Sequence, residues 1–275
     1  MPIPPVSGQV EITTVVDWAV EAEEAGWDAF SVWDHLLMWY PEDHEVFDPW
    51  IVRAAIAVKT KSIKIASNIT PLARRRPWKV ARESVSLDHL SNGRVIMGVG
   101  LGAPPEEFDA FGEEANPKIR AEKLDEAMEI LTGLWSGEPV SFKGKHFNLK
   151  EVTFRPRPVQ KPRIPIWVGG AWPNKNPFRR AARYDGVVPT REWPDFLSPE
   201  DLREVLTLIE GYRGNLKDFD AAVFGQTTGV DKTEDRLTIE SWIESGATWW
   251  FEMINGWRAK PKELLERIRN GPPEV

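Results

Sequence analysis

Histidine is the side chain best suited to proton transfer at neutral pH, and the chain holds four of them. His35 comes directly after the apolar segment 28–33, where a buried strand is expected to end. A histidine there can exchange a proton with a cofactor ring or a substrate hydroxyl, so we predict that His35 is catalytic, with a bond to backbone as the alternative. His89 at a helix end is predicted to be structural, His44 lies in an acidic segment, and His146 has no sequence partner for chemistry.

Glycines cluster at two places where strands are expected to end, GVGLG (98–102) and GGAWPNKNP (169–177). Glycine lets a backbone approach a ligand closely, and free N–H groups ahead of a helix bind phosphate. These segments suggest a cofactor that carries a phosphate, although GVGLG lacks the spacing of a dinucleotide fingerprint and tight turns are the alternative. The arginine run 74–76 could meet the same phosphate or form salt bridges instead.

Tryptophan is unusually common, with 14 tryptophans against 3 tyrosines. Several fall in expected loops, where large flat side chains would wall a pocket, and filling the core is the alternative. Trp172 and Trp193 follow expected strands and are predicted to line that pocket. Trp249 and Trp250 are adjacent in one expected strand, so at most one of them can face the interior.

The composition disfavours several classes of function. The formal net charge of -7 argues against nucleic acid or an anionic membrane as partner, because both bind basic surfaces. No apolar run is long enough to span a bilayer and the first residues do not resemble a signal peptide, so a cytoplasmic location is expected. Without cysteine, and without the spacing of a metal site, we predict no metal. The expected substrate is a small organic molecule.

Repeated βα units must position these residues, because short apolar runs alternate with longer segments of helical period. Strands are predicted to begin near residues 28, 63, 94, 164, 186, 221 and 248, and helices over 15–26, 49–60, 77–90, 118–135, 177–184, 199–212, 233–246 and 261–270. A (β/α)8 barrel needs one strand more. Only residues 1–5 remain for it, so the first strand is expected to be short or incomplete.

Residues 137–165 interrupt this rhythm, because PVSFKGKHFNL is typical of a hairpin and FRPRPVQKPR has too many prolines for a central strand. The predicted fold class is therefore α/β, a (β/α)8 TIM barrel with a short or incomplete first strand and a hairpin excursion before the fifth strand. We expect residues 1–275 to form one domain. Active sites of such barrels lie at the carboxyl ends of the strands, where His35 and both glycine segments fall.

Four segments, taken in order, resemble the bacterial luciferase-like monooxygenase family: EAEEAGWDAFSVWDHL, ITPLARRRPWKVARESVSLDHLSNGRVIMGVGLG, FRPRPVQKPRIPIWVGGAWP and RRAARYDGVVP. The resemblance runs from about residue 12 to 190 and more loosely to 258. It implies a TIM barrel that holds FMN, or the deazaflavin coenzyme F-420 (F420), at the carboxyl ends of its strands.

The resemblance also implies roles for particular residues. In the deazaflavin-dependent sugar-phosphate and alcohol dehydrogenases of the family, a histidine followed four residues later by tryptophan faces the cofactor ring, as His35 and Trp39 would here. The family often has a cis peptide at the end of the third strand, which here would join Ser67 to Asn68. The implied cofactor site consists of Trp39, Ser67, Asn68, Thr70, Gly100, Gly102, Gly169, Gly170, Ala171 and Trp172.

Two positions depart from the family pattern. The dehydrogenases carry an acidic residue shortly after the glycines of the fourth strand, where this chain has Ala103. Bacterial luciferase has an arginine for the cofactor phosphate near the position of Leu101. Because neither feature carries over, the sequence does not identify the substrate.

The main hypothesis for function is a luciferase-like monooxygenase that uses dioxygen and reduced FMN, supplied by a separate flavin reductase, to act on a small organic substrate. One alternative is an F420-dependent dehydrogenase or reductase, which His35 and Trp39 favour and Ala103 disfavours. Another is a non-catalytic flavin-binding barrel, favoured by the curtailed first strand. The resemblance further implies a homodimer formed through the helices after the second and third strands.

Overall fold

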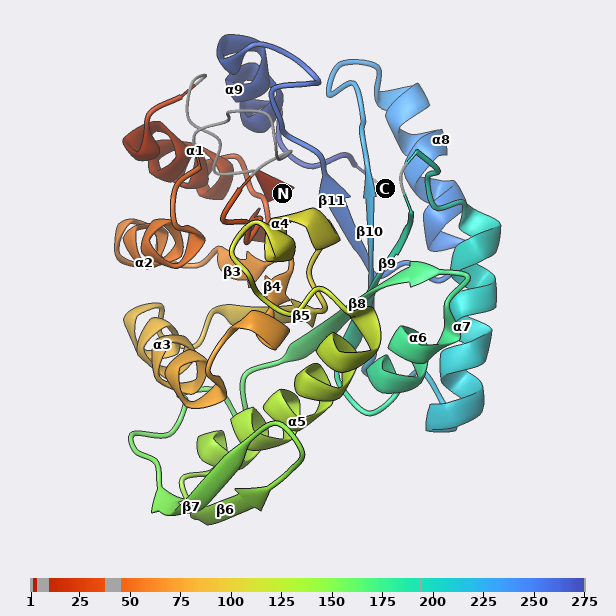
Figure 1. The fold of residues 1–275 in the computed structure, drawn as a ribbon. Coiled ribbons are helices and arrows are strands. Elements are labelled where there is room, and N and C mark those ends of the chain that lie inside the picture. Colours follow the sequence, from red (N-terminus) through yellow and green to blue (C-terminus); the bar gives the residue numbers. More distant parts are fainter. Residues whose placement is uncertain (1, 4–9, 38–45, 193, 275) are drawn as a thin grey trace.

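The computed structural model of the protein describes residues 2–3, 10–37, 46–192 and 194–274 (Figure 1). Its main sheet is curved, with strands in the order β1-β2-β3-β5-β8-β9-β10-β11, and neighbouring strands along this path pair in parallel. Helices lie around the outside of the sheet (Figure 1). This arrangement confirms the predicted α/β barrel-like fold.

The elements alternate as βα units. The strands are β1 (Pro2–Ile3), β2 (Ala29–Val32), β3 (Lys64–Ser67), β4 (Thr70–Pro71), β5 (Val95–Gly100), β6 (Pro139–Lys143), β7 (Asn148–Thr153), β8 (Ile166–Trp172), β9 (Gly186–Arg191), β10 (Asp220–Gly225) and β11 (Trp249–Glu252). The helices are α1 (Ile12–Glu24), α2 (Pro49–Lys59), α3 (Pro77–Leu90), α4 (Pro105–Asp109), α5 (Pro117–Ser136), α6 (Lys175–Ala181), α7 (Pro199–Arg213), α8 (Lys232–Ile243) and α9 (Pro261–Arg269), with a 3-10 turn η1 (Leu72–Arg74). Every strand and helix expected from the sequence is present.

Local signals fix where the helices begin and end. Asp48 accepts hydrogen bonds from the amides of Trp50 and Ile51 at the start of α2, and Pro49 occupies the first turn, where its missing N–H costs nothing. At the carboxyl end of a different helix, α5, Gly137 adopts a φ of 69°, the left-handed conformation that glycine tolerates best. None of the helices in the described part of the chain is long and apolar enough to cross a membrane.

Side chains alternate between two cores along each strand. The interior of the barrel is filled by Ala66, Ile96, Trp167, Val188, Ala222 and Phe251. A larger core lies between the sheet and the helices and contains their sequence neighbours. Trp249 packs inward, with its ring centroid 5.2 Å from that of Trp167, whereas Trp250 packs with the outer core. The prediction that at most one of these two tryptophans faces the interior is confirmed.

The first strand is short, as predicted. β1 pairs with β2 only at Ser31 and Val32, and no backbone pairing joins β11 to β1 among the described residues. A cavity of about 210 Å³ lies beside this gap, and its lining includes Trp27, Ala29, Trp242, Trp249 and Trp250. The helices close the ring instead: Trp27 Nε1 donates to the carbonyl of Ile268 in α9 at 2.9 Å.

The predicted hairpin excursion is also present. β6 and β7 form a separate antiparallel pair between α5 and β8, away from the main sheet (Figure 1). The carboxylate of Glu126 in α5 accepts hydrogen bonds from the amides of Lys145, His146 and Phe147 in the hairpin turn. The excursion therefore packs against α5, apart from the main sheet.

Candidate active site

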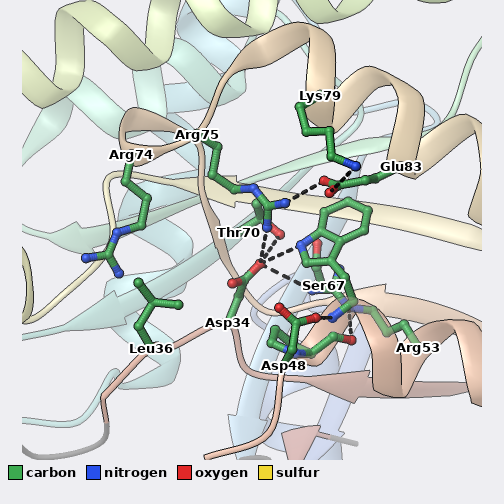
Figure 2. Close-up of polar contacts among 12 residues, drawn as sticks. Asp34, Leu36, Asp48, Arg53, Ser67, Thr70, Arg74, Arg75, Lys79 and Glu83 are labelled. Carbon is green, nitrogen blue, oxygen red and sulfur yellow. Dashed lines mark hydrogen bonds and ion pairs between the residues drawn. The ribbon is translucent and has the colours of Figure 1, made fainter.

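The end of β2 carries the best candidate for chemistry and the aspartate that fixes its position. Trp33 and His35 alternate with Asp34, whose carboxylate points toward α2. Its Oδ2 accepts hydrogen bonds from Trp50 Nε1 at 3.0 Å, Arg53 at 3.2 Å and the Thr70 hydroxyl at 2.8 Å (Figure 2). Asp34 thus ties the end of β2 to α2 and β4, a different role from the backbone cap that is common for aspartate.

His35 is paired with a buried glutamate that comes from α4. Its Nδ1 lies 3.0 Å from Glu107 Oε2, and the Glu107 side chain is only 2% exposed. The other oxygen of Glu107 accepts from the amide of Leu36 at 2.6 Å and from Arg74 at 2.7 Å. The carboxylate therefore holds both the imidazole and the backbone that follows it.

Glu107 is ionised at neutral pH. Burial raises the pKa of Glu107, but hydrogen bonds from His35, the Leu36 amide and Arg74 lower it more, to about 2. An ionised carboxylate only accepts hydrogen bonds, so the Nδ1 atom of His35 carries the hydrogen in this pair. Among the described residues no hydrogen bond is recorded for the Nε2 atom, and the His35 side chain keeps 25% of its surface exposed.

The sequence analysis did not find Glu107. It looked for the family's acid at Ala103, whereas the structure brings an acid to His35 from four residues further on. The short helix α4 was missed because five residues carry too little periodicity to be recognised. One signal was available: Pro105 followed by Glu106 and Glu107 is typical of a first helical turn, where proline and acidic residues are both favoured.

The cis peptide bond lies one position further along than expected. It joins Asn68 to Ile69, not Ser67 to Asn68, so that prediction is wrong. Ser67 still belongs to the regular ladder of β3: it is in register with Val32, and its hydroxyl donates to the carbonyl of Gly98 at 2.9 Å. The chain departs from the ladder only after Ser67.

This departure brings the side chain of Ile69 over two of the glycines in the implied cofactor site. A Cβ added at Gly169 would lie 1.7 Å from Ile69 Cδ1, and one at Gly100 would lie 3.1 Å from Ile69 Cγ2. Gly102, with a φ of 83°, makes similar room for Phe108 and Pro71. These glycines make room for protein side chains, and their contact with a cofactor stays a prediction.

Successive residues of β8 point to opposite faces of the sheet, so Gly170 and Trp172 lie on one face and Ala171 on the other. Gly170 faces Pro177 of α6, and Trp172 packs against Phe178 of the same helix with ring centroids 5.7 Å apart. Trp172, expected to wall the pocket, therefore packs toward α6. Ala171, between them in the strand, alternates to the opposite side, and its contact with the cofactor stays a prediction.

Two buried polar atoms lack a protein partner near the end of β3. Ser31 Oγ and Asn68 Nδ2 are both buried, and neither has a hydrogen-bond partner among the described residues. Buried polar groups are rarely left unpaired, so each of these atoms suits a bond to a bound ligand. Asn68 is one of the residues implied as a cofactor contact, and Ser31 is one that the sequence analysis missed.

The arginine run at 74–76 is used inside the protein. Arg74 binds Glu107 and Glu113, each at 2.7 Å, and its side chain is 5% exposed. Arg75 binds Glu83 at 2.5 Å (Figure 2), and Arg76 lies over the ring of Trp78. These contacts favour the salt-bridge alternative over a phosphate site.

Other predicted residues lie away from this cluster or outside the described part. His89 Nε2 lies 2.8 Å from the carbonyl of Arg157, and His146 Nε2 lies 2.9 Å from Glu122. Trp39, His44 and Trp193 fall outside the described residues. Within the residues that the structure describes, no three histidine, aspartate or glutamate side chains gather as a metal would require.

Comparison with known proteins identifies the family. The family model described as luciferase-like monooxygenase matches residues 3–235, and the chain belongs to this family of oxidoreductases. The fold is similar to the coenzyme F420 dependent tetrahydromethanopterin reductase from Methanopyrus kandleri, with a TM-score of 0.76, 18% identity and coverage of 98% of this chain and 95% of that one.

Two curated relatives carry further information. The chain is 34% identical over 163 residues to an F420-dependent glucose-6-phosphate dehydrogenase of Amycolatopsis mediterranei, covering 58% of this chain and 48% of the relative. It is 35% identical over 183 residues to an F420-dependent hydroxymycolic acid dehydrogenase of Mycobacterium tuberculosis, covering 66% of this chain and 49% of the relative. The chain thus spans about half the length of these relatives.

Proposed function

We propose that this protein is an F420-dependent oxidoreductase that interconverts an alcohol and a carbonyl compound. The proposal replaces reduced FMN and dioxygen, the main hypothesis from the sequence, with the alternative that the curated relatives favour, since both are F420-dependent dehydrogenases. The observation that carries it is the His35–Glu107 pair at the end of β2. The pair includes an acidic residue from four positions beyond Ala103, the position at which the lack of one had disfavoured a dehydrogenase.

The described residues fit a planar ligand with polar edges at the carboxyl ends of the strands. Asn68 Nδ2 and Ser31 Oγ are buried donors that have no partner in the described part of the chain. Ile69, placed over Gly100 and Gly169, offers an apolar surface beside them. These residues would hold the deazaflavin ring, which when bound accepts or donates a hydride.

The task of the protein is then to move one proton. When an alcohol is oxidised to a carbonyl compound, His35 Nε2 would take the O–H proton, and the bound cofactor would supply the acceptor for the hydride of the C–H bond. Glu107 holds the Nδ1 hydrogen and stabilises the resulting imidazolium, because the carboxylate is ionised and buried. Arg74 and the Leu36 amide in turn hold Glu107 in place.

Cofactor binding and turnover test the proposal separately. We expect F420 to bind at least tenfold more tightly than FMN, a difference of about 1.4 kcal/mol, in equilibrium fluorescence titrations. His35→Ala should abolish the alcohol-dependent loss of oxidised F420, and Glu107→Gln should lower kcat about a hundredfold. His89→Ala, at the end of α3, serves as the control and should leave both F420 binding and turnover unchanged.

Tighter binding of FMN than of F420 would contradict the cofactor assignment. Full activity of His35→Ala would contradict the proton transfer. Circular dichroism of each variant ensures that a loss of activity is not a loss of fold.

A further inference from the structure

Charged side chains at the carboxyl ends of the strands turn away from the barrel interior. Asp34 binds Trp50 and Arg53 of α2, and Glu252 binds Arg267 of α9. Arg191 at the end of β9 binds Asp201 of α7, with Nε 3.1 Å from Oδ2. Each of these charges is thus paired with a surrounding helix and is not presented to a ligand inside the mouth.

The side chains that cap the inner core are apolar. Ile69 and Phe224 pack against the inner core, and the rings of Phe224 and Phe251 stack at 5.4 Å. Phe224 and Ile69 are only partly buried, so they form the upper surface of that core. Ile69 and Phe224 therefore offer an apolar surface to a ligand that enters between the strand ends.

One wall beside His35 consists of two stacked tryptophans from opposite ends of the chain. The rings of Trp33 and Trp257 are 6.1 Å apart with an interplanar angle of 30°. Trp33 also lies edge-on to His35, with centroids again 6.1 Å apart. Trp257 nevertheless exposes 57% of its surface. An exposed tryptophan that stacks on the ring beside His35 is typical of a binding surface.

Hydrogen bonds fix the loop that carries Trp257. The Asn255 side chain accepts from the amides of Trp257 at 3.2 Å and Arg258 at 3.1 Å. The Arg258 guanidinium binds the buried carboxylate of Glu252 and donates to the carbonyl of Met253 at 2.8 Å. Because the backbone on both sides of Trp257 is held, the wall is in place before a substrate arrives.

We infer that the Trp33–Trp257 stack selects the substrate, and that this substrate is an uncharged alcohol or carbonyl compound with an apolar ring or chain, not a sugar phosphate. The inference rests on the proposed function and adds the chemical class of its substrate. The apolar group would lie against the stack while the hydroxyl faces His35 Nε2. Arg191 at the end of β9 is paired with Asp201, and Arg120 of α5, beside the end of β5, is 3% exposed and packs over the Phe108 ring, so neither is presented to a phosphate.

Turnover of matched substrates tests this inference. With F420-loaded protein, we expect 1-phenylethanol to be oxidised with a kcat/KM at least tenfold above that of glucose 6-phosphate. Trp257→Ala should raise KM for 1-phenylethanol about tenfold, equivalent to about 1.4 kcal/mol, and leave kcat within about twofold. Trp257→Phe should recover most of the loss, because a smaller ring can still stack.

A second measurement does not depend on turnover. Saturation-transfer NMR should detect binding of acetophenone to cofactor-free protein and show it weakened in Trp257→Ala. Tyr212→Ala is the matched control, since Tyr212 is an exposed aromatic residue in the last turn of α7 at 50% exposure. It should change neither KM nor acetophenone binding.

The outcomes separate this inference from the proposed function. Failure of F420 to bind would overturn the proposed function itself. If F420 binds but glucose 6-phosphate is the better substrate, or neither compound is oxidised, the substrate class is wrong. An unchanged KM and unchanged acetophenone binding in Trp257→Ala would overturn the role of the stack.

Discussion

Glu107 is the residue on which the site depends, and its position shows how local contacts outweigh burial. Moving a carboxylate out of water disfavours its charge, yet Glu107 accepts hydrogen bonds from Leu36, Leu37 and Arg74 and pairs with His35. The sum keeps it ionised. A histidine alone at a strand end is weak evidence for catalysis, whereas a histidine oriented by a buried carboxylate is a recurring arrangement for proton transfer.

The low pKa of Glu107 predicts an acid-sensitive site. Its folded-state pKa of about 2 lies below the ordinary value of 4.5, so the carboxylate stabilises the fold fully above pH 4.5 and progressively less as the pH falls toward 2. We expect Glu107→Gln to lower the free energy of unfolding by about 3 kcal/mol at pH 7. The difference from wild type should shrink through this window in urea titrations.

Glu23 provides the control for that pH dependence. Burial raises the pKa of Glu23, but hydrogen bonds from the amides of Ile63, Ser62 and Lys61 lower it to about 2. The Glu107→Gln protein should therefore keep the part of its acid sensitivity that comes from Glu23. A constant difference between wild type and variant from pH 7 to pH 3 would contradict the assignment.

At the scale of elements, the packing of β3, β5 and β8 depends on glycines that face a single isoleucine. We expect Gly169→Ala to destabilise the protein by about 1–3 kcal/mol, because its Cβ would overlap Ile69 Cδ1. The double variant Gly169→Ala with Ile69→Ala should be more stable than the sum of the single effects, because the overlap is gone. Urea unfolding measures all three.

Gly211→Ala is the matched control for this prediction. A Cβ at Gly211 meets nothing within 4 Å, and the residue lies inside α7. The substitution should stabilise the protein by about 0.5–1 kcal/mol. Strictly additive effects of the Gly169 and Ile69 substitutions would show that the two side chains do not compete for space.

The sequence predicts the helices and strands well, but it predicts the contacts between strands and the direction of individual side chains poorly. Apolar runs and helix caps such as Asp48 mark the βα units, because burial and capping repeat in every unit. The approach of Ile69 to Gly100 and Gly169 is a contact between separate strands, which periodicity does not encode. Alternation in β8 places Trp172 toward α6, a fact that depends on the exact strand register.

The site was predicted only in part for the same reason. His35 follows from its place after a strand, and the contact that orients it spans 72 residues of sequence. The stack of Trp33 on Trp257 joins the two ends of the chain, so no local motif predicts it. The glycine segments were recognised as special, but the structure fills the space beside them with Ile69, Pro177 and Phe108.

At the scale of the whole molecule, α2 and α3 expose large apolar side chains to solvent. Ile51 and Val58 lie seven residues apart on α2 and are 63% and 65% exposed, and Leu90 at the end of α3 is 53% exposed. Residues at this spacing share one helix face. We propose that this face forms the homodimer that the family resemblance implies.

Sedimentation velocity tests the dimer. The wild-type protein should sediment as a dimer, and the pair of substitutions Ile51→Glu and Val58→Glu should give a folded monomer, because two charges would be buried without partners. Leu237→Glu on α8, where Leu237 is 64% exposed, is the control and should remain dimeric. A monomeric wild-type protein would contradict the proposal.

The short first strand leaves a seam in the ring of strands. β8 is paired with β5 on one side and with β9 on the other, whereas β11 has β10 as its only strand neighbour among the described residues. Opening at such a seam breaks fewer backbone hydrogen bonds than opening elsewhere. In deuterated buffer, the amide hydrogens of β11 should exchange earlier than those of β8. Local opening of the barrel should therefore begin between its first and last βα units.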